Sequence, residues 1–353
     1  MGGDRTFDLD NLLKLVDPEP VRIDPQACLV ARHRRSHCRR CTSACPHAAL
    51  RVDDGKVVVD TASCHKCGLC AGACPTAAMT VHGIDDGAVL AAAAVHCSRA
   101  KGGGIQVPCL GYLSVDHLLT MGLRHPSVAL TCGQCDTCPW QAGGERAREA
   151  VRTASALLAA LGSSHTVQMA AATGAEGAGP GLSRRELFGL WRTESTQVAR
   201  QFLPEQKLNY AQLPTRLPAR RGRWLRQISQ EDLPDAAMPQ GPWKARRAGD
   251  ACTGCGICAS FCPTGALAAQ AADGHWTLTH QPAACVDCGT CVDLCPVRTM
   301  DEEPLTVPAM VGAERREVIS LVTRRCRSCR REFKGRPEDE QCPNCRSVFA
   351  SFR

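Results

Sequence analysis

The middle of the chain alternates between short apolar stretches and segments with helical character. The apolar stretches cover residues 89–95, 105–107, 128–131 and 166–169. The helix-like segments cover residues 114–122 and 141–161. Because this alternation is typical of strands joined by helices, it predicts a small α/β domain in which helices cover a parallel sheet.

A hairpin turn is predicted on either side of this region. Asp53-Asp54-Gly55 precedes a strand-like stretch with three consecutive valines at residues 56–60. Ala272-Asp273-Gly274 is flanked by short mixed segments. Asp-Gly between two strands is a common hairpin turn. We therefore expect an α+β multidomain fold, and 353 residues suggest about two or three domains.

No apolar run is long enough to cross a membrane. The longest, at residues 89–95, is alanine-rich and far shorter than the roughly 18 residues of a membrane helix. Residues 1–10 are polar and acidic, with no apolar export segment behind them. We expect a soluble, unexported protein of the cytoplasm.

The cysteine content points to metal. Hydrophobic and charged residues make up an ordinary 44% and 22%, but the chain has 25 cysteines and only 4% aromatic residues. An odd number of cysteines cannot all pair in disulfides, and nearly all of these lie in tight clusters. Clustered thiolates are ligands for soft metals, whereas disulfide scaffolds scatter their cysteines and need an oxidising compartment.

Two identical cysteine runs stand in the C-terminal half. Each reads C-x2-C-x2-C-x3-C-P, and the eight cysteines are Cys252, Cys255, Cys258, Cys262, Cys285, Cys288, Cys291 and Cys295. This pair resembles a bacterial ferredoxin domain with two [4Fe-4S] clusters, in which the fourth cysteine of each run binds the other run's cluster. The resemblance implies one cluster on Cys252, Cys255, Cys258 and Cys295, and a second on Cys262, Cys285, Cys288 and Cys291. Two zinc knuckles are the alternative.

A second copy in the N-terminal third makes this an internal repeat. Its complete run is Cys64, Cys67, Cys70 and Cys74, followed by proline. The preceding run keeps Cys38, Cys41 and Cys45 but has Arg35 in place of its first cysteine. The resemblance implies one cluster on Cys45, Cys64, Cys67 and Cys70.

The fourth ligand of the remaining cluster, with Cys38, Cys41 and Cys74, is open. Cys28, ten residues before Cys38, is the preferred candidate because it is otherwise isolated. The alternatives are a three-iron cluster with three thiolates, or a ligand from His33 or His37.

Five further cysteines follow the predicted central strands. Cys97, Cys109 and Cys132 come at the ends of the first three strands, and Cys135 and Cys138 lie in the turn after the third. Ligand sites in open α/β sheets collect at the carboxyl ends of the strands. We therefore expect three separate segments to bring thiolates to one edge of the sheet.

This central region resembles, more loosely, the delta subunit of methyl-viologen-reducing hydrogenases and related heterodisulfide reductase modules. The resemblance covers about residues 87–168 and rests on Cys97, Val107-Pro108-Cys109-Leu110-Gly111 and the Cys135-x2-Cys138 turn. It implies a [2Fe-2S] cluster on Cys97, Cys109, Cys135 and Cys138 at a junction with electron-bifurcating partners. The last pair is spaced more closely than in that family, and Cys132 is additional. A zinc site, a redox-active dithiol and plain buried thiols are the alternatives.

Cysteines are absent from residues 173–248. Residues 174–181 are rich in small side chains and are interpreted as a linker. Ser183-Arg184-Arg185-Glu186 has the capping-box pattern that predicts the start of a helix. Residues 213–224 mix prolines with arginines, which favours an exposed connector or a docking surface for an acidic redox partner.

The tail carries two C-x2-C pairs separated by twelve residues: Cys326, Cys329, Cys342 and Cys345. This spacing matches a zinc ribbon with four thiolates, whose small size makes its folding depend on the metal. Arg330 and Arg346 stand where a rubredoxin-like iron site usually has glycine, so zinc is preferred to iron. Arginines crowd the first pair and make this end basic.

Six segments are predicted. They are an N-terminal extension (1–27), a dicluster ferredoxin-like domain (28–86), a small α/β cysteine-containing domain (87–172), a linker with a helix (173–247), a second dicluster ferredoxin-like domain (248–303) and a zinc-ribbon-like domain (315–353).

The predicted function is electron transfer through about four [4Fe-4S] clusters. No G-x-G-x-x-G turn lies between a strand and a helix, so no flavin or nicotinamide site is expected. We expect a subunit or carrier that serves the catalytic subunit of an oxidoreductase, rather than a complete enzyme. One alternative is a thiol-disulfide or heterodisulfide-type reductase that uses the central cysteines. Another is an iron-sulfur regulator that uses the basic ribbon on nucleic acid, although nucleic acid is not the expected partner.

Overall fold

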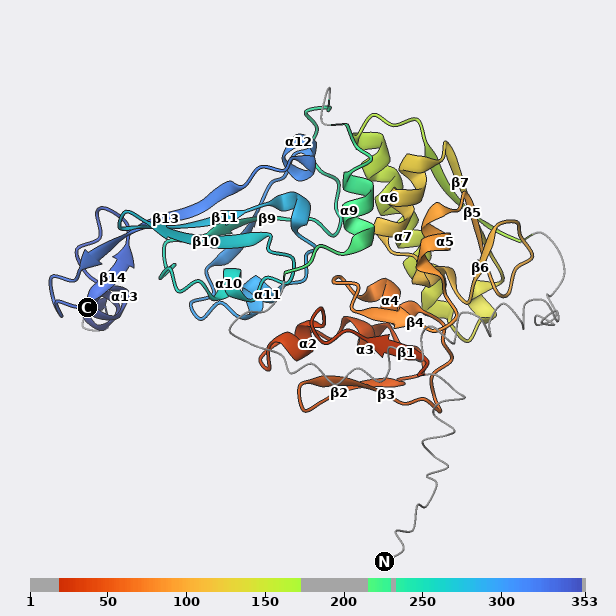
Figure 1. Ribbon diagram of the computed structural model, residues 1–353, viewed down its shortest axis with the longest axis horizontal. Coiled ribbons are helices and arrows are strands. Elements are labelled where there is room, and N and C mark those ends of the chain that lie inside the picture. Colours follow the sequence, from red (N-terminus) through yellow and green to blue (C-terminus); the bar gives the residue numbers. More distant parts are fainter. Residues whose placement is uncertain (1–18, 173–214, 230–232, 351–353) are drawn as a thin grey trace, which may run out of the picture.

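The computed structural model describes residues 19–172, 215–229 and 233–350 (Figure 1). It has a mixed helix and strand fold built around several small sheets. Within these ranges, no helix combines the length and apolar character that crossing a membrane requires. The predicted linker at 174–181 and the helix start at 183–186 lie outside the described residues.

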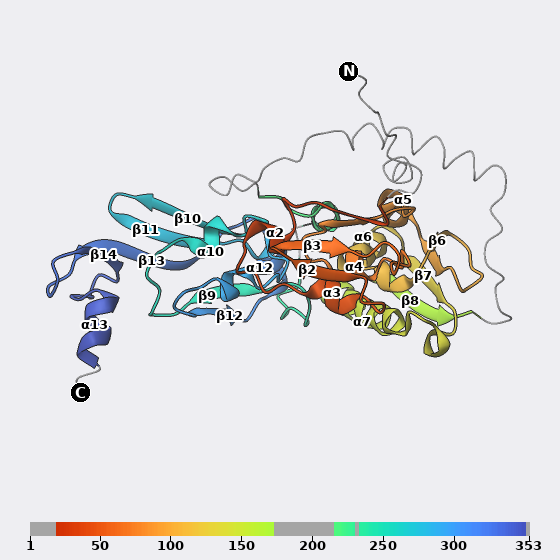
Figure 2. The same cartoon turned by 90° about the horizontal axis from the view of Figure 1, so that it is seen from below.

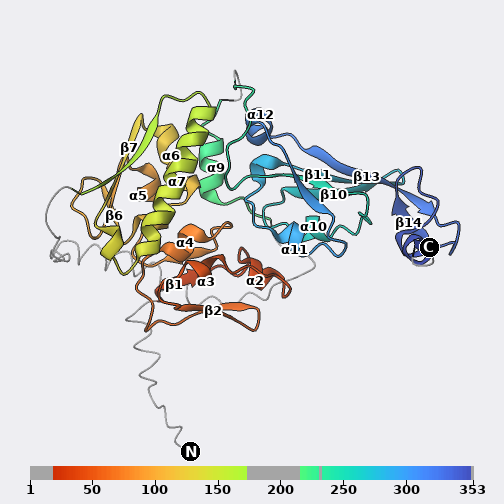
Figure 3. The same cartoon turned by 180° about the vertical axis from the view of Figure 1, so that it is seen from behind.

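A parallel four-stranded sheet forms the central unit, as the sequence pattern predicts. Its order is β6 (Ile105–Val107), β5 (Ala94–Cys97), β7 (Ser127–Cys132) and β8 (Thr166–Ala171). Every neighbouring pair is parallel. Helices α6 (Val115–Arg124) and α7 (Gln141–Ala160) pack against each other on the same side of this sheet in Figures 1 and 3.

The stretch at 89–95 is not one strand, contrary to the sequence analysis. Helix α5 (Asp86–Ala91) covers its first half, and β5 begins only at Ala94. The helix starts where it does because the Asp85 carboxylate accepts hydrogen bonds from the N–H groups of Gly87 (2.9 Å) and Ala88 (3.1 Å). This N-cap satisfies donors that the first helical turn leaves unpaired.

The first dicluster unit consists of two strand pairs and three short helices. Strand β1 (Val21–Ile23) pairs with β4 (Met79–Val81), and β2 (Leu50–Asp53) with β3 (Lys56–Val59). Both residues of the β2–β3 turn are left-handed, with φ of 42° at Asp54 and 70° at Gly55, so this predicted hairpin is confirmed. The helices are α2 (Leu29–Arg32), α3 (Arg40–Ala44) and α4 (Leu69–Ala73). Because β1 precedes residue 28, the predicted N-terminal extension contributes a strand to this unit.

The second dicluster unit repeats this plan. Strand β9 (Ala245–Ala248) pairs with β12 (Met300–Glu303), and β10 (Leu267–Ala272) with β11 (His275–His280). The predicted hairpin is again confirmed, with φ of 51° at Asp273 and 76° at Gly274. The helices within the two runs are α10 (Ile257–Ser260) and α11 (Thr290–Asp293).

The predicted ribbon segment is not separate from the second dicluster unit. Strand β13 (Arg316–Arg325) pairs with β11 through its first half and with β14 (Glu332–Gly335) through its second. One antiparallel sheet, in the order β10-β11-β13-β14, therefore joins the two (Figure 2). Two more helices belong to this half, α12 (Val307–Val311) and α13 (Pro343–Ala350).

Helix α9 (Ala219–Leu225) corrects the expectation of an exposed connector at 213–224. It packs against α6, and Figure 1 shows it between the central unit and the second dicluster unit. Trp224 and Arg221 have no exposed surface. The indole Nε1 of Trp224 and the Nε of Arg221 each lie 2.9 Å from Oδ1 of Asp116. Arg220 and Arg221 can be buried because Asp116 pairs with both of them, whereas Arg216 and Arg223 are exposed.

The first dicluster unit touches both other parts of the molecule. A continuous hydrophobic core runs from this unit through the central sheet to α9, and a second core fills the second dicluster unit. Figures 1 and 3 show the first dicluster unit lying across the other two.

Candidate metal centres

The complete cysteine runs share a loop geometry that turns their thiols to one side. In each, the residue before the second cysteine is left-handed: Lys66, Gly254 and Asp287, with φ of 51°, 63° and 47°. The glycine after that cysteine is left-handed too: Gly68, Gly256 and Gly289, with φ of 82°, 75° and 80°. The third cysteine then lies in a short helix. In the incomplete run Arg39 occupies the glycine position with φ −130°, so this turn is missing.

Sixteen cysteines gather in four groups, which we number in the order of their contacts. Site 1 is Cys45, Cys64, Cys67 and Cys70; site 2 is Cys28, Cys38, Cys41 and Cys74; site 3 is Cys262, Cys285, Cys288 and Cys291; site 4 is Cys252, Cys255, Cys258 and Cys295.

In each group, burial and the neighbouring thiols raise the pKa of some of the cysteines. At site 4, burial with Cys252 and Cys255 raises the pKa of Cys258 to about 12. At site 1, burial with Cys67 and the neighbouring Cys41 raises the pKa of Cys70 to about 12. Several thiolates that share a buried site repel one another, so these groups need a cation or a cluster to carry the charge.

Cys28 lies with Cys38, Cys41 and Cys74, the three cysteines for which the sequence left the fourth ligand open. It is buried at the N-terminus of α2, and its thiol lies among those of Cys74, Cys38 and Cys41. His33, an alternative ligand in the sequence analysis, instead lies edge-on against Phe261 with ring centroids 4.4 Å apart. Its Nδ1 accepts a hydrogen bond from the N–H of Arg35 at 3.0 Å.

The last cysteine of every run accepts a backbone hydrogen bond on its sulfur. The donors are the N–H groups of Ala49, Ala78, Leu267 and Thr299, at 3.3, 3.2, 3.5 and 3.5 Å. Such donors stabilise negative charge on a cluster and are among the factors that set its reduction potential.

Each of the four groups of thiols fits a polynuclear cluster better than a single metal ion. Among the described residues, the group whose ligand atoms all lie within 4.8 Å of one another is the C-terminal one, not any of sites 1 to 4. A pocket of about 340 Å³ lies between the cysteines of site 3. All-thiolate donors around such a space suit an iron-sulfur cluster.

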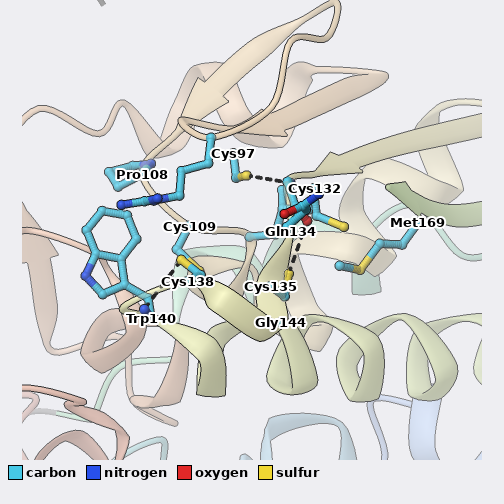
Figure 4. A pocket seen from close by; sticks show the side chains of 13 residues that line it. Cys97, Pro108, Cys109, Cys132, Gln134, Cys135, Cys138, Trp140, Gly144 and Met169 are labelled. Atoms are coloured by element: carbon cyan, nitrogen blue, oxygen red, sulfur yellow. Dashed lines mark hydrogen bonds between the residues drawn. The ribbon is translucent and has the colours of Figure 1, made fainter. Parts of the chain in front are cut away.

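The five central cysteines line one pocket of about 350 Å³ (Figure 4). Cys97 and Cys132 end β5 and β7, and Cys109 follows β6. Cys135 begins the short 3-10 helix η2 (Cys135–Thr137), and Cys138 comes directly after it. The predicted meeting of these thiols at one sheet edge is thus what the structure has. Cys132, which the predicted ligand set leaves out, lines the same pocket and lies against Cys135.

Backbone donors and close packing organise this pocket. The sulfur of Cys97 accepts a hydrogen bond from the N–H of Gly133 at 3.2 Å, and that of Cys138 from Trp140 at 3.4 Å. A Cβ at Gly143 would lie 2.4 Å from the Cys109 sulfur, and one at Gly144 would lie 2.8 Å from that of Cys135. This glycine pair was not predicted as part of the site, although two adjacent glycines in the first turn of a predicted helix are a signal of close approach.

The four C-terminal cysteines form a compact group. The sulfurs of Cys329 and Cys342 are 3.8 Å apart. Four thiolates at about 2.3 Å from a tetrahedral ion are separated by about 3.8 Å, so the group has the dimensions of a mononuclear site. Backbone N–H groups of Cys329 and Cys342 lower the pKa of Cys326 to about 6, which favours the thiolate that a metal binds.

Buried and polar contacts join the two dicluster units. Arg40 Nη2 donates to the carbonyl of Asp287 at 2.6 Å. Arg221 Nη1 donates to the carbonyl of Cys285 at 3.2 Å, and Arg220 donates to that of Cys74. The two arginines of α9 thus contact one ligand of site 2 and one of site 3, while both face Asp116 of the central unit.

Comparison with known proteins identifies the two cysteine-rich units by class. Residues 34–78 and 251–299 match the family of 4Fe-4S dicluster domains. No curated protein matches the chain. The chain therefore carries two ferredoxin-type domains, which support an iron-sulfur role in electron transfer. The first match starts at residue 34 and so does not include Cys28.

Proposed function

We propose that the protein is a linear electron relay, with four [4Fe-4S] clusters bound at sites 1 to 4. The relay serves an oxidoreductase, as a subunit or as a carrier. Each cluster, when bound, accepts and releases one electron at a time. The observation that carries the proposal is that the ligand loops of consecutive sites touch one another.

The relay begins at the central pocket. The Cys109 thiol lies near that of Cys67, a ligand of site 1, and the two share a small apolar cluster with Leu69 and Trp140. The indole Nε1 of Trp140 donates to Nε2 of His47 at 3.1 Å, which ties the pocket to the loop after Cys45. Sites 1 and 2 follow each other directly, because the thiol of Cys70 neighbours that of Cys41.

The relay continues from site 2 to site 3 across the contact between the two dicluster units. The bond from Arg40 to the Asp287 carbonyl joins helix α3 of site 2 to the loop between Cys285 and Cys288 of site 3. Site 4 lies in the same unit as site 3. Its Cys255 is exposed, which gives the relay an opening to a partner at this end.

The central pocket suits a [2Fe-2S] cluster on Cys97, Cys109, Cys135 and Cys138, in line with the looser resemblance to the delta subunit of hydrogenase modules. Its donors are thiolates with N–H groups aimed at their sulfurs. A docked oxidoreductase partner would exchange electrons here. The compact C-terminal group suits a structural zinc ion, which would hold β14 and α13 onto the end of the sheet.

Iron content and stepwise reduction test the relay. Reconstituted protein should hold about sixteen irons in cubanes, and about two more if the central pocket binds [2Fe-2S]. Fewer than about twelve would contradict four cubanes. Replacing Cys288 of site 3 with serine should slow electron flow between partners at the two ends, because it interrupts the middle of the path. The matched replacement of Ser127, an exposed residue at the start of β7 and outside the four sites, with alanine should not.

A second candidate function is a thiol-disulfide reductase, favoured by one observation. Cys132 and Cys135 lie in contact in a pocket that has five thiols, one more than a four-ligand cluster uses. Under this alternative, the Cys135→Ser and Cys138→Ser double variant would abolish disulfide reduction while all four cubanes survive. Under the relay, the same variant lacks only the entry from the central pocket.

A further inference from the structure

Site 3 is surrounded by buried positive charge. Arg32 of α2, Arg221 of α9 and Arg246 of β9 are only 2%, 0% and 5% exposed. Guanidinium groups are seldom buried to this degree. In the described ranges one other arginine is buried, Arg220, and it faces site 2.

Each of the three side chains reaches the ligands of site 3 from a different direction. Arg32 comes from the first dicluster unit and lies near the thiols of Cys262 and Cys288. Arg221 donates to the carbonyl of Cys285 at 3.2 Å. Arg246 lines the site 3 pocket, beside the thiols of Cys291 and Cys285.

The carboxylates near these three arginines are at least as numerous as the arginines, but only Asp116 is buried, whereas Asp24, Asp287 and Glu302 are partly or fully exposed. Arg221 shares the buried Asp116 with Arg220. Arg246 pairs with Asp287 at 2.9 Å and with Glu302 at 3.4 Å, whose side chains are 25% and 52% exposed. Water screens exposed carboxylates, so the positive charge acts on site 3 with less compensation.

Sites 1 and 4 differ from site 3 in this respect. The charged groups that act on the thiols of Cys67, Cys70, Cys252 and Cys258 are other cysteines. At site 3, by contrast, burial raises the pKa of Cys285 and Cys291, and Arg246, which lines the same pocket, opposes this effect at both thiols by stabilising negative charge.

We propose that site 3 is the electron sink of the chain: Arg32, Arg221 and Arg246 give its cluster the highest reduction potential of the four. The inference rests on the proposed relay and adds an order of potentials to it. Uptake of one electron, from a low-potential one-electron donor, adds one negative charge to the cluster and breaks no bond. Buried guanidinium groups stabilise that added charge, because little water lies between them and the sulfur ligands. Electrons entering from either end would therefore collect in the middle of the molecule.

A redox titration of the full chain followed by EPR tests this proposal. The first signal to appear on reduction should belong to site 3. Cys288→Ser should alter that first signal, whereas the matched Cys255→Ser, at the same position of the run in site 4, should leave it unchanged. These two variants require no change at the arginines and so remain informative if an arginine variant does not fold.

Substitution of Arg246 tests the cause. Arg246→Gln should disfavour reduction of site 3 at least tenfold, which is 59 mV for one electron, while Arg246→Lys should stay near the original potential. Arg315→Gln is the control. Arg315 also donates to two backbone carbonyls of this unit, those of Gly265 and Ala266, but it is exposed.

Two results would overturn the proposal. One is a first signal that responds to Cys255→Ser, or to neither cysteine variant. The other is a site 3 potential that is equal in Arg246→Gln, Arg246→Lys and the original protein. Either result, in protein that holds about sixteen irons and relays electrons, refutes the sink and leaves the relay standing. An iron content below about twelve refutes the relay itself.

Discussion

The two dicluster units share the order strand, helix, hairpin, helix and strand, to which the first unit adds helix α2, but they differ in what surrounds them. The first unit lacks one cysteine of its first run and shares its hydrophobic core with the central sheet. The second has both runs complete, its own core, and a hairpin widened by β13 and β14. The spacing of the cysteines therefore specifies the loops around the clusters, while other segments decide how each unit is held.

The largest expected effect concerns the missing cysteine. In the first unit Cys28→Ser should convert site 2 to a three-iron cluster, visible as a new EPR signal of the oxidised protein, because one corner loses its thiolate. In the second unit Cys252→Ser, which removes the first cysteine of a complete run, should do the same at site 4. Cys132→Ser serves as the control, since it lies outside both units.

If Cys28→Ser leaves the iron content and the spectrum unchanged while Cys252→Ser does not, the two units differ in more than the position of one ligand. Site 2 would then find its fourth ligand elsewhere.

Removal of the C-terminal metal should destabilise the second dicluster unit and leave the stability of the first unit unchanged. A chelator that strips the group of Cys326, Cys329, Cys342 and Cys345 should unfold β14 and α13, because a module of this size depends on its metal. Since β13 pairs with both β14 and β11, hydrogen exchange should also rise in the hairpin of the second unit. Exchange in β2 and β3 of the first unit serves as the internal reference. Equal changes in both hairpins would show that the tail does not support the second unit in particular.

The junction between the units should be sensitive to a single charge. Asp116→Asn removes the carboxylate that faces Arg220 and Arg221, and should cost about 3–5 kcal/mol of unfolding free energy, as breaking a buried ion pair does. Glu145→Gln breaks the exposed pairs with Arg148 and Arg152 and should cost less than about 1 kcal/mol. Urea unfolding of the two variants measures the difference, and similar midpoints would argue against a structural role for Asp116.

The smallest effect is expected at the two hairpin turns, where the units are most alike. Gly55→Ala and Gly274→Ala each force a left-handed backbone on alanine, with open space around the new methyl group. Each should destabilise its unit by about 1–2 kcal/mol. Gly103→Ala, also in open space but without a positive φ, should cost less. If thermal unfolding shows different losses of stability for Gly55→Ala and Gly274→Ala, the two hairpins do not contribute equally to the stability of their units.

Local features of this protein could be predicted from its sequence. The Asp-Gly turns follow from short-range patterns, because turn geometry depends on neighbouring residues. The parallel central sheet and the meeting of the thiols at one edge follow from the alternation of strands and helices, because the carboxyl ends of parallel strands lie at the same edge. The prediction of a strand at residues 89–95 was wrong for an equally local reason. The N-cap residue Asp85, which starts helix α5, lies before the apolar stretch on which that prediction was based. The prediction of an exposed connector at residues 213–224 was wrong because the sequence does not show that Asp116 pairs with Arg220 and Arg221 and allows them to be buried.

The sequence by itself determined which cysteines stand in closely spaced runs and where each loop turns, since cysteine spacing and left-handed turns are properties of adjacent residues. Only the tertiary structure decided which loops face each other. Asp116 lies about a hundred residues before Arg220 and Arg221, and Arg40 lies 247 residues before Asp287. No periodicity connects positions so far apart. Burial makes an ion pair or a carbonyl contact decisive there, and burial exists only once the units have packed together.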